Sequence, residues 1–263
     1  MIIRHDIDPE RYLVRPERFP AVVAVDSALE EVFAAYDNID RMLKPNLLAE
    51  IEPGPEFCDR CDGMGTLIRP DWILTAAHVA AELSLDKAIE FDKTPYTIQQ
   101  IALHPHFHRD VMAQVKNDIA LIQLNQPVAK VTPLPLYKQT DELQKTVTFL
   151  GRGDYGTGLT GPDQTDGKMR IATNRVEKVD EQWLLFQFDA PPHTTELEGM
   201  SGPGDRGGPA LLETEAGWVI AGISSGQDAD TSLGTLSEGR YGVWEYYTRV
   251  SKYIDWIESV VQV

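Results

Sequence analysis

Short apolar runs, separated by turn-forming residues, fill the chain from residue 64 onward. Runs such as WILTAA, DIALIQL and GWVIAGIS are rich in β-branched and aromatic residues and are bounded by Gly, Pro, Asn or Asp. An earlier run of the same kind is FPAVVAV at residues 19–25. Many short strands at such spacing are typical of barrels and sandwiches, whereas βαβ units need a helix between strands. The pattern therefore predicts an all-β fold.

Two segments change to a helical period. In the first, Ser27 and Glu30 form a capping box, and apolar residues then recur at three- and four-residue steps. This predicts a helix over about 27–44, which we interpret as a packed insertion rather than a partner-binding element. In the second, SKYIDWIESVV carries an apolar face that predicts a C-terminal helix over 251–262.

The charge balance limits the partners that the chain can have. Its 263 residues include 24 basic and 41 acidic side chains, and the net charge of −17 repels phosphate backbones and anionic membranes. We therefore expect no nucleic-acid and no membrane partner, and we interpret acidic runs such as ELE at 196–198 as part of a solvated face. The start MIIRHDIDPERY has no apolar signal-peptide core, so we expect a cytoplasmic protein as written, and a secreted one if a signal peptide precedes it.

Cysteine and histidine patterns raise the question of metal binding. The only two cysteines, Cys58 and Cys61, form a single C-x-x-C, which lacks the two further ligands of a zinc site. In HPHFH, the residues His104, His106 and His108 alternate as in some metal sites. We interpret both segments as surface loops and predict no metal and no cofactor.

Three segments together carry the chemistry of a hydrolase. TAAHV ends an apolar run at His78, and NDIALIQL opens an apolar strand at Asp118, whose carboxylate needs a partner when buried. GDRGGP is a glycine-rich turn whose backbone N–H groups can converge on a developing negative charge.

These segments resemble the chymotrypsin/trypsin-like family of serine proteases. TAAHV is similar to the family's T-A-A-H-C, NDIAL to D-I-A-L, and GDRGGP to G-D-S-G-G-P, in the family's order. The resemblance extends over about 19–258. It implies a single peptidase domain over 1–263, built from two perpendicular antiparallel six-stranded β-barrels at 19–133 and 134–250, with the site between them.

The resemblance also implies roles for individual residues. His78 resembles the general base and Asp118 its orienting carboxylate. The backbone of Gly204, Asp205 and Arg206 resembles the oxyanion hole. Four further positions resemble the specificity pocket, with Met200 at its base and Ser224, Gly226 and Gly242 on its walls. A thioether at the base favours an apolar ligand side chain and offers nothing to a basic one.

Arg206 departs from the family pattern because it stands where the family has its nucleophilic serine. A guanidinium is neither a nucleophile nor deprotonated near neutral pH. We therefore predict an inactive serine peptidase relative, a pseudoprotease, in which Arg206 pairs with a nearby acid and blocks the site. The cleft between the barrels would still bind a peptide or protein ligand, and we favour a monomer. The alternative is an active serine endopeptidase using His78 and Asp118, which requires a serine at 206 in the natural protein or rescue by Ser201 or Ser224.

The N-terminus is a second departure. In the family, the acid at the position of Asp205 pairs with a free N-terminal ammonium. We expect a retained Met1 to block this pairing, so that either processing exposes Ile2 or Asp205 pairs with another cation such as Arg206.

The cysteines are a third departure. Val79 stands where the family has the cysteine that follows the histidine. The resemblance therefore implies that Cys61 is free or pairs with Cys58.

Overall fold

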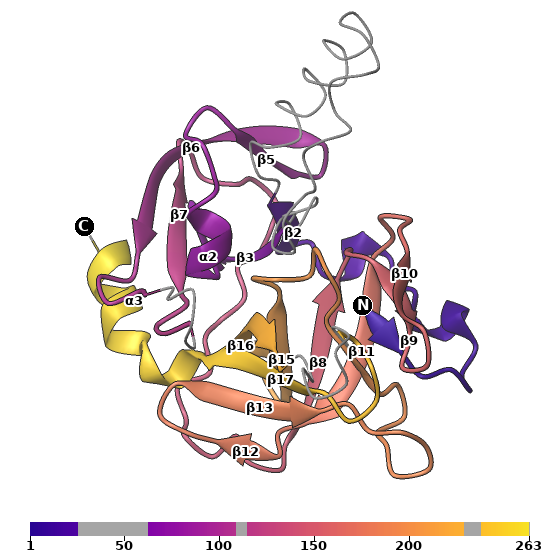
Figure 1. Ribbon diagram of the computed structural model, residues 1–263. Coiled ribbons are helices and arrows are strands. Elements are labelled where there is room, and N and C mark those ends of the chain that lie inside the picture. Colours follow the sequence, from indigo (N-terminus) through magenta and orange to yellow (C-terminus); the bar gives the residue numbers. More distant parts are fainter. Residues whose placement is uncertain (26–62, 109–114, 229–237, 263) are drawn as a thin grey trace, which may run out of the picture.

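The computed structural model describes residues 1–25, 63–108, 115–228 and 238–262 (Figure 1). The helix predicted over 27–44 lies outside the described residues, and so do both cysteines. The described part is mostly β-structure, as the sequence predicts, and its strands form two large curled sheets and one small sheet.

The first large sheet has six strands in the order β2–β3–β4–β7–β6–β5, all antiparallel. Its outer strands β2 and β5 contact each other, so the sheet is nearly closed. The apolar runs of the sequence fill its centre, where Leu67, Ile73 and Leu121 have no exposed surface. The strands are β2 (Val22–Val25), β3 (Gly63–Arg69), β4 (Trp72–Thr75), β5 (Ala88–Phe91), β6 (Thr94–Leu103) and β7 (Ala120–Leu124).

The second large sheet has seven strands rather than the six expected, in the order β11–β8–β15–β16–β17–β13–β12. The additional strand is the two-residue β12, which pairs with β13 at the edge. Stacked aromatic rings fill the core, with the ring centroids of Phe149 and Tyr247 4.7 Å apart. The strands are β8 (Thr146–Gly151), β11 (Arg170–Arg175), β12 (Lys178–Val179), β13 (Trp183–Gln187), β15 (Pro209–Thr214), β16 (Gly217–Gln227) and β17 (Trp244–Arg249).

The small sheet holds the N-terminus in place. Strand β1 (Ile2–Ile3) lies between β14 (Gly199–Met200), to which it is antiparallel, and β9 (Tyr155–Thr157), to which it is parallel. Strand β10 (Gly161–Gln164) completes the order β10–β9–β1–β14. Two 3-10 turns, η1 (Pro9–Tyr12) and η2 (Pro16–Arg18), then lead to β2. The parallel pair of β1 and β9 lies in this small sheet, whereas both large sheets are antiparallel throughout, as expected.

Two short helices complete the described structure. Helix α2 (Ala77–Ala80) follows β4 directly and contacts β7. At the C-terminus, the 3-10 turn η4 (Val250–Lys252) precedes helix α3 (Ile254–Val261), which buries Ile257 in the core of the first sheet. The regular helix is thus shorter than the predicted range of 251–262. Among the described residues, no helix is long and apolar enough to cross a membrane.

Candidate active site

His78 and Asp118 meet because two paired strands end side by side. His78 lies in α2, directly after β4, and Asp118 lies just before β7. In the register of these strands, Thr75 is opposite Ala120. The backbone N–H of His78 donates to Oδ1 of Asp118 at 2.9 Å, and its Nδ1 lies 2.7 Å from Oδ2. The double contact fixes the orientation of the imidazole ring.

Asp118 has no exposed surface, yet it is a stable anion. Burial alone would raise its pKa, but the interaction with His78 and the hydrogen bonds from His78 and Ser225 outweigh burial and hold the pKa below its usual value. The Ser225 hydroxyl donates to Oδ2 at 2.5 Å. Sequence reasoning missed Ser225 and selected its neighbour Ser224. The alternation of side chains along a strand was the available signal, since consecutive serines point to opposite faces.

The turn from Gly202 to Gly208 presents two backbone donors. The N–H of Asp205 donates to the Gly202 carbonyl at 3.0 Å, and Gly208 donates back to Asp205 at 3.0 Å. Gly204 has a φ of +86°, a left-handed conformation that favours glycine. In the described part of the chain, the N–H groups of Gly204 and Arg206 donate to no backbone or side-chain acceptor. They are therefore free to bind an oxygen that carries negative charge.

Asp205 pairs with the chain's own first residue. The Met1 ammonium lies 2.5 Å from Oδ2 of Asp205, and both groups are 1% exposed. The N–H groups of Gly153 and Gly202 donate to the same carboxylate at 2.7 and 2.9 Å. The expectation that a retained Met1 blocks this pairing is wrong, because β1 inserts between two strands and carries the ammonium to Asp205.

The Arg206 side chain contacts strand β16 and Glu238. Its Nη1 donates to the Ser225 carbonyl at 2.6 Å, and its Nη2 lies 3.3 Å from a carboxylate oxygen of Glu238. The side chain remains 23% exposed. Within the described residues, no Ser, Thr or Cys side chain is hydrogen-bonded to the His78 ring.

We use the term pocket region for five residues that lie where the resemblance places the specificity pocket. They are Met200, Ser201, Ser224, Gly226 and Glu245. Met200 is fully buried against a small apolar cluster. Glu245, which sequence reasoning missed, is also fully buried and accepts hydrogen bonds from the backbone N–H (3.1 Å) and the hydroxyl of Ser201. The Ser224 hydroxyl donates to the Ser201 hydroxyl at 3.2 Å. The pocket region thus contains a buried carboxyl group in addition to the Met200 thioether, and the preference for an apolar ligand side chain stays a prediction.

Burial decides the electrostatics of Glu245. It raises the pKa to about 7, although the Ser201 hydrogen bonds and the positive charge of Arg206 lower it and the charge of Asp205 raises it further. Glu245 was missed because the sequence places it among aromatic residues of a strand, without a motif. Only the pairing of β16 with β17 brings it to the pocket region.

Gln227 forms hydrogen bonds with two segments beside the pocket region. Its Nε2 donates to the Ser201 carbonyl at 2.7 Å, and its Oε1 accepts from the N–H of Gly239 at 3.1 Å. Gly242, predicted on the pocket wall, lies in the turn before β17 and donates to the Phe188 carbonyl at 2.7 Å.

A hollow of about 250 Å³ lies between the two sheets, beside Ser225. Val115 comes from the side of the first sheet, and the remaining lining comes from β13, β16, β17 and Asp228, which follows β16. The rings of Trp183 and Tyr246 meet edge to face, with centroids 6.0 Å apart. The lining residues are Val115, Trp183, Ser225, Gly226, Gln227, Asp228 and Tyr246.

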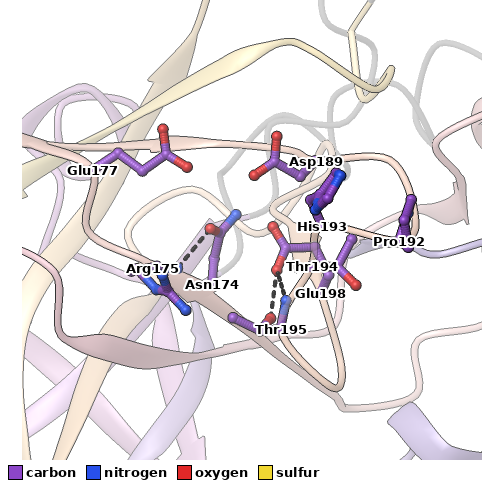
Figure 2. Close-up of a pocket in the computed structure, with 9 residues that line it drawn as sticks. All are labelled: Asn174, Arg175, Glu177, Asp189, Pro192, His193, Thr194, Thr195 and Glu198. Atoms are coloured by element: carbon purple, nitrogen blue, oxygen red, sulfur yellow. Dashed lines mark hydrogen bonds between the residues drawn. The ribbon is translucent and has the colours of Figure 1, made fainter.

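A second hollow, of about 400 Å³, lies on the second sheet and is acidic (Figure 2). Glu177 and Asp189 face each other across it, and burial, together with their mutual contact, raises the pKa of Glu177. Glu198 is 1% exposed, and burial raises its pKa as well. Of the acidic run at 196–198, Glu196 is exposed as expected, but Glu198 is buried, because its carboxylate accepts from the Thr195 N–H.

Of the three histidines of HPHFH, His104 and His106 are in contact, since the His106 N–H donates to Nδ1 of His104 at 3.2 Å. His104 packs edge to face on Tyr253 and Trp256, and His108 pairs through its backbone with Lys116. Among the described residues, no group of three or more His, Cys, Asp or Glu side chains is placed to hold a metal ion.

Two curled antiparallel sheets with a histidine–aspartate pair where they meet define the class of double-barrel, chymotrypsin-like proteins. A family model described as Trypsin matches residues 59–257. The chain therefore belongs to the trypsin family. Among curated proteins, a tryptase from Mus musculus is 29% identical over 222 residues, which cover 75% of this chain and 77% of the tryptase.

Proposed function

We propose that this chain is a serine peptidase relative that does not hydrolyse peptides, because Arg206 occupies the position of the nucleophilic serine. One observation carries the proposal. The Arg206 side chain binds the Ser225 carbonyl and Glu238, and in the described residues the His78 ring has no hydroxyl or thiol to activate. Without such a group no acyl-enzyme forms.

The neighbouring serines support this proposal, since each has another contact. The Ser201 hydroxyl donates to Glu245, that of Ser224 to Ser201, and that of Ser225 to Asp118. Triad chemistry tolerates only small displacements of the nucleophile. Rescue by any of the three would require moving a buried side chain.

The other residues of the site favour a catalytic arrangement that lacks the attacking hydroxyl group. His78 would act as the base, Asp118 as its orienting carboxylate, and the N–H groups of Gly204 and Arg206 as the oxyanion donors. The hollow lined by Trp183 and Tyr246 offers an apolar surface for a side chain of a bound peptide. We therefore propose peptide binding without cleavage.

Labelling by a fluorophosphonate, which reacts with activated serines, tests the proposal. We expect the unaltered protein to remain unlabelled and Arg206→Ser to label at the substituted position, at least about 10³-fold faster than the unaltered protein. The matched controls are Arg206→Ala, which removes the guanidinium without adding a hydroxyl, and the double variant Arg206→Ser/His78→Ala.

Two results would count against the proposal. Labelling of any serine in the unaltered protein would make it an active serine hydrolase. An Arg206→Ser protein that is unlabelled yet melts like the unaltered protein would mean that more than the attacking oxygen is missing.

A further inference from the structure

Arg206 lies in a setting that resembles a binding site for a cation. Its guanidinium contacts the Ser225 carbonyl and a Glu238 carboxylate oxygen. The charge of Arg206 also acts on the buried carboxyl of Glu245, although the two groups form no direct ion pair. One carbonyl and one carboxylate oxygen thus contact a single guanidinium, the donor fork that matches such acceptors best.

Two further features accommodate the guanidinium. Gly226 has no side chain, and a Cβ built there would lie 3.2 Å from Nη1 of Arg206, so the glycine allows the close approach. Gln227 bridges the Ser201 carbonyl and the Gly239 N–H, which holds the surrounding segments together. Gln227 therefore links the segment of Ser201 to the segment that follows Glu238 without involving Arg206.

We infer that Arg206 is an internal ligand of the pocket region, standing where the cationic side chain of an external ligand would bind and keeping such ligands out. The inference deepens the proposed function and rests on it, since Arg206 takes no part in chemistry there. The guanidinium also occupies the Ser225 carbonyl, which an added peptide strand would otherwise use. External peptides are left with the hollow beside Trp183.

The inference predicts that truncating Arg206 creates a binding site for an alkylguanidinium. In Arg206→Ala, the missing atoms are those of N-ethylguanidinium, which we expect to bind with a dissociation constant on the order of 1 mM, typical of so small a ligand. At a tenfold excess over that constant, the melting temperature of the variant should rise by roughly 3–6 °C. Calorimetric titration measures the same binding directly.

Controls separate this site from general effects of the salt. The unaltered protein and Arg11→Ala, which truncates an exposed arginine paired with Glu196, should show no shift. N-ethylurea has the same shape without the charge and should not stabilise Arg206→Ala. Binding should strengthen from pH 6 to pH 8, because Glu245 ionises over this range and attracts the cation. Once Arg206 is truncated, the titratable groups that still act on Glu245 are Asp205 and Tyr247.

A measurement on the unaltered protein covers the case in which Arg206→Ala fails to fold. Phenylglyoxal modifies accessible guanidinium groups, and mass spectrometry reads each arginine separately. Arg206 should react at least about tenfold more slowly than Arg11, because two acceptors hold it. Equal rates at Arg206 and Arg11 would overturn the inference.

The remaining outcomes are also decisive. A folded Arg206→Ala protein that does not bind N-ethylguanidinium, or that binds N-ethylurea equally well, overturns the inference and leaves the proposed function intact. Fluorophosphonate labelling of the unaltered protein overturns the proposed function, whatever the guanidinium result.

Discussion

Two fully buried carboxyl groups are linked by hydrogen bonds to consecutive serines of strand β16, and they behave differently. Asp118 accepts a hydrogen bond from Ser225, and its pKa lies below the usual value. Glu245 accepts a hydrogen bond from Ser201, which in turn accepts one from Ser224, and the pKa of Glu245 is raised to about 7. Both pay the same kind of desolvation cost. The difference is that His78 supplies Asp118 with charge and two hydrogen bonds, whereas Glu245 receives its hydrogen bonds from Ser201 alone.

The comparison shows which half of the site follows the family arrangement. The His78 side has a complete partner set around its anion. On the pocket side, Gln227 donates to the Ser201 carbonyl and the Arg206 guanidinium donates to the Ser225 carbonyl. The chain thus combines a histidine–aspartate pair with a pocket region that contains a second buried carboxyl group.

Removing the Asp118 carboxylate should have the largest effect on stability. Asp118→Ala leaves the buried donors of His78 and Ser225 without an acceptor and should cost about 3–5 kcal/mol of unfolding free energy at pH 7. Urea unfolding measures the loss. The control Glu258→Ala removes an exposed carboxylate paired with Lys138 and should change stability by less than about 1 kcal/mol. A loss at Asp118 no larger than at Glu258 would contradict the account of the histidine–aspartate pair.

The pH dependence of stability should differ in sign between the two groups. The folded-state pKa of Glu245 is raised from 4.5, so its contribution is fully present below pH 4.5 and is lost as the pH rises through about 7. The loss amounts to about 3 kcal/mol. Asp118 has a lowered pKa, so its contribution is present above pH 3.8 and is lost only at lower pH.

The variant Glu245→Gln isolates this effect. Urea unfolding at pH 5, 6, 7 and 8 should show that the unaltered protein loses stability relative to the variant as the pH rises. Other buried carboxyls, such as Glu198, are present in both proteins and cancel in the difference. Parallel pH profiles for the two proteins would mean that Glu245 keeps an ordinary pKa.

The two consecutive serines of β16 provide the smallest test. Ser225→Ala removes a hydrogen bond to an ionised carboxylate and should cost about 1.5–3 kcal/mol. Ser224→Ala removes a hydrogen bond to a neutral hydroxyl and should cost about 0.5–1.5 kcal/mol. Both changes delete one buried oxygen from the same strand, so each is the control for the other. A larger loss of stability in Ser224→Ala than in Ser225→Ala would contradict this order.

The sequence predicted the parts of the site that lie next to strong local patterns. His78 and Asp118 each adjoin an apolar run, and the paired strands bring the runs together. Ser225 and Glu245 adjoin no such motif, and their roles depend on which strands pair and in which register. The seventh strand of the second sheet was missed for a similar reason, because two residues are too short to carry a periodic pattern.

The N-terminal strand β1 also sets the order in which the molecule can assemble. Its ammonium bonds to the carbonyl of Asp154, 153 residues along the chain, and its strand partner β14 is farther still. Contacts between such distant segments form late in folding, because the chain between them must first lose its freedom. We therefore expect the turn that carries Arg206 to become rigid only in the last folding step, when Met1 reaches Asp205. Refolding should show this as a slow phase seen at the site but not in the first sheet.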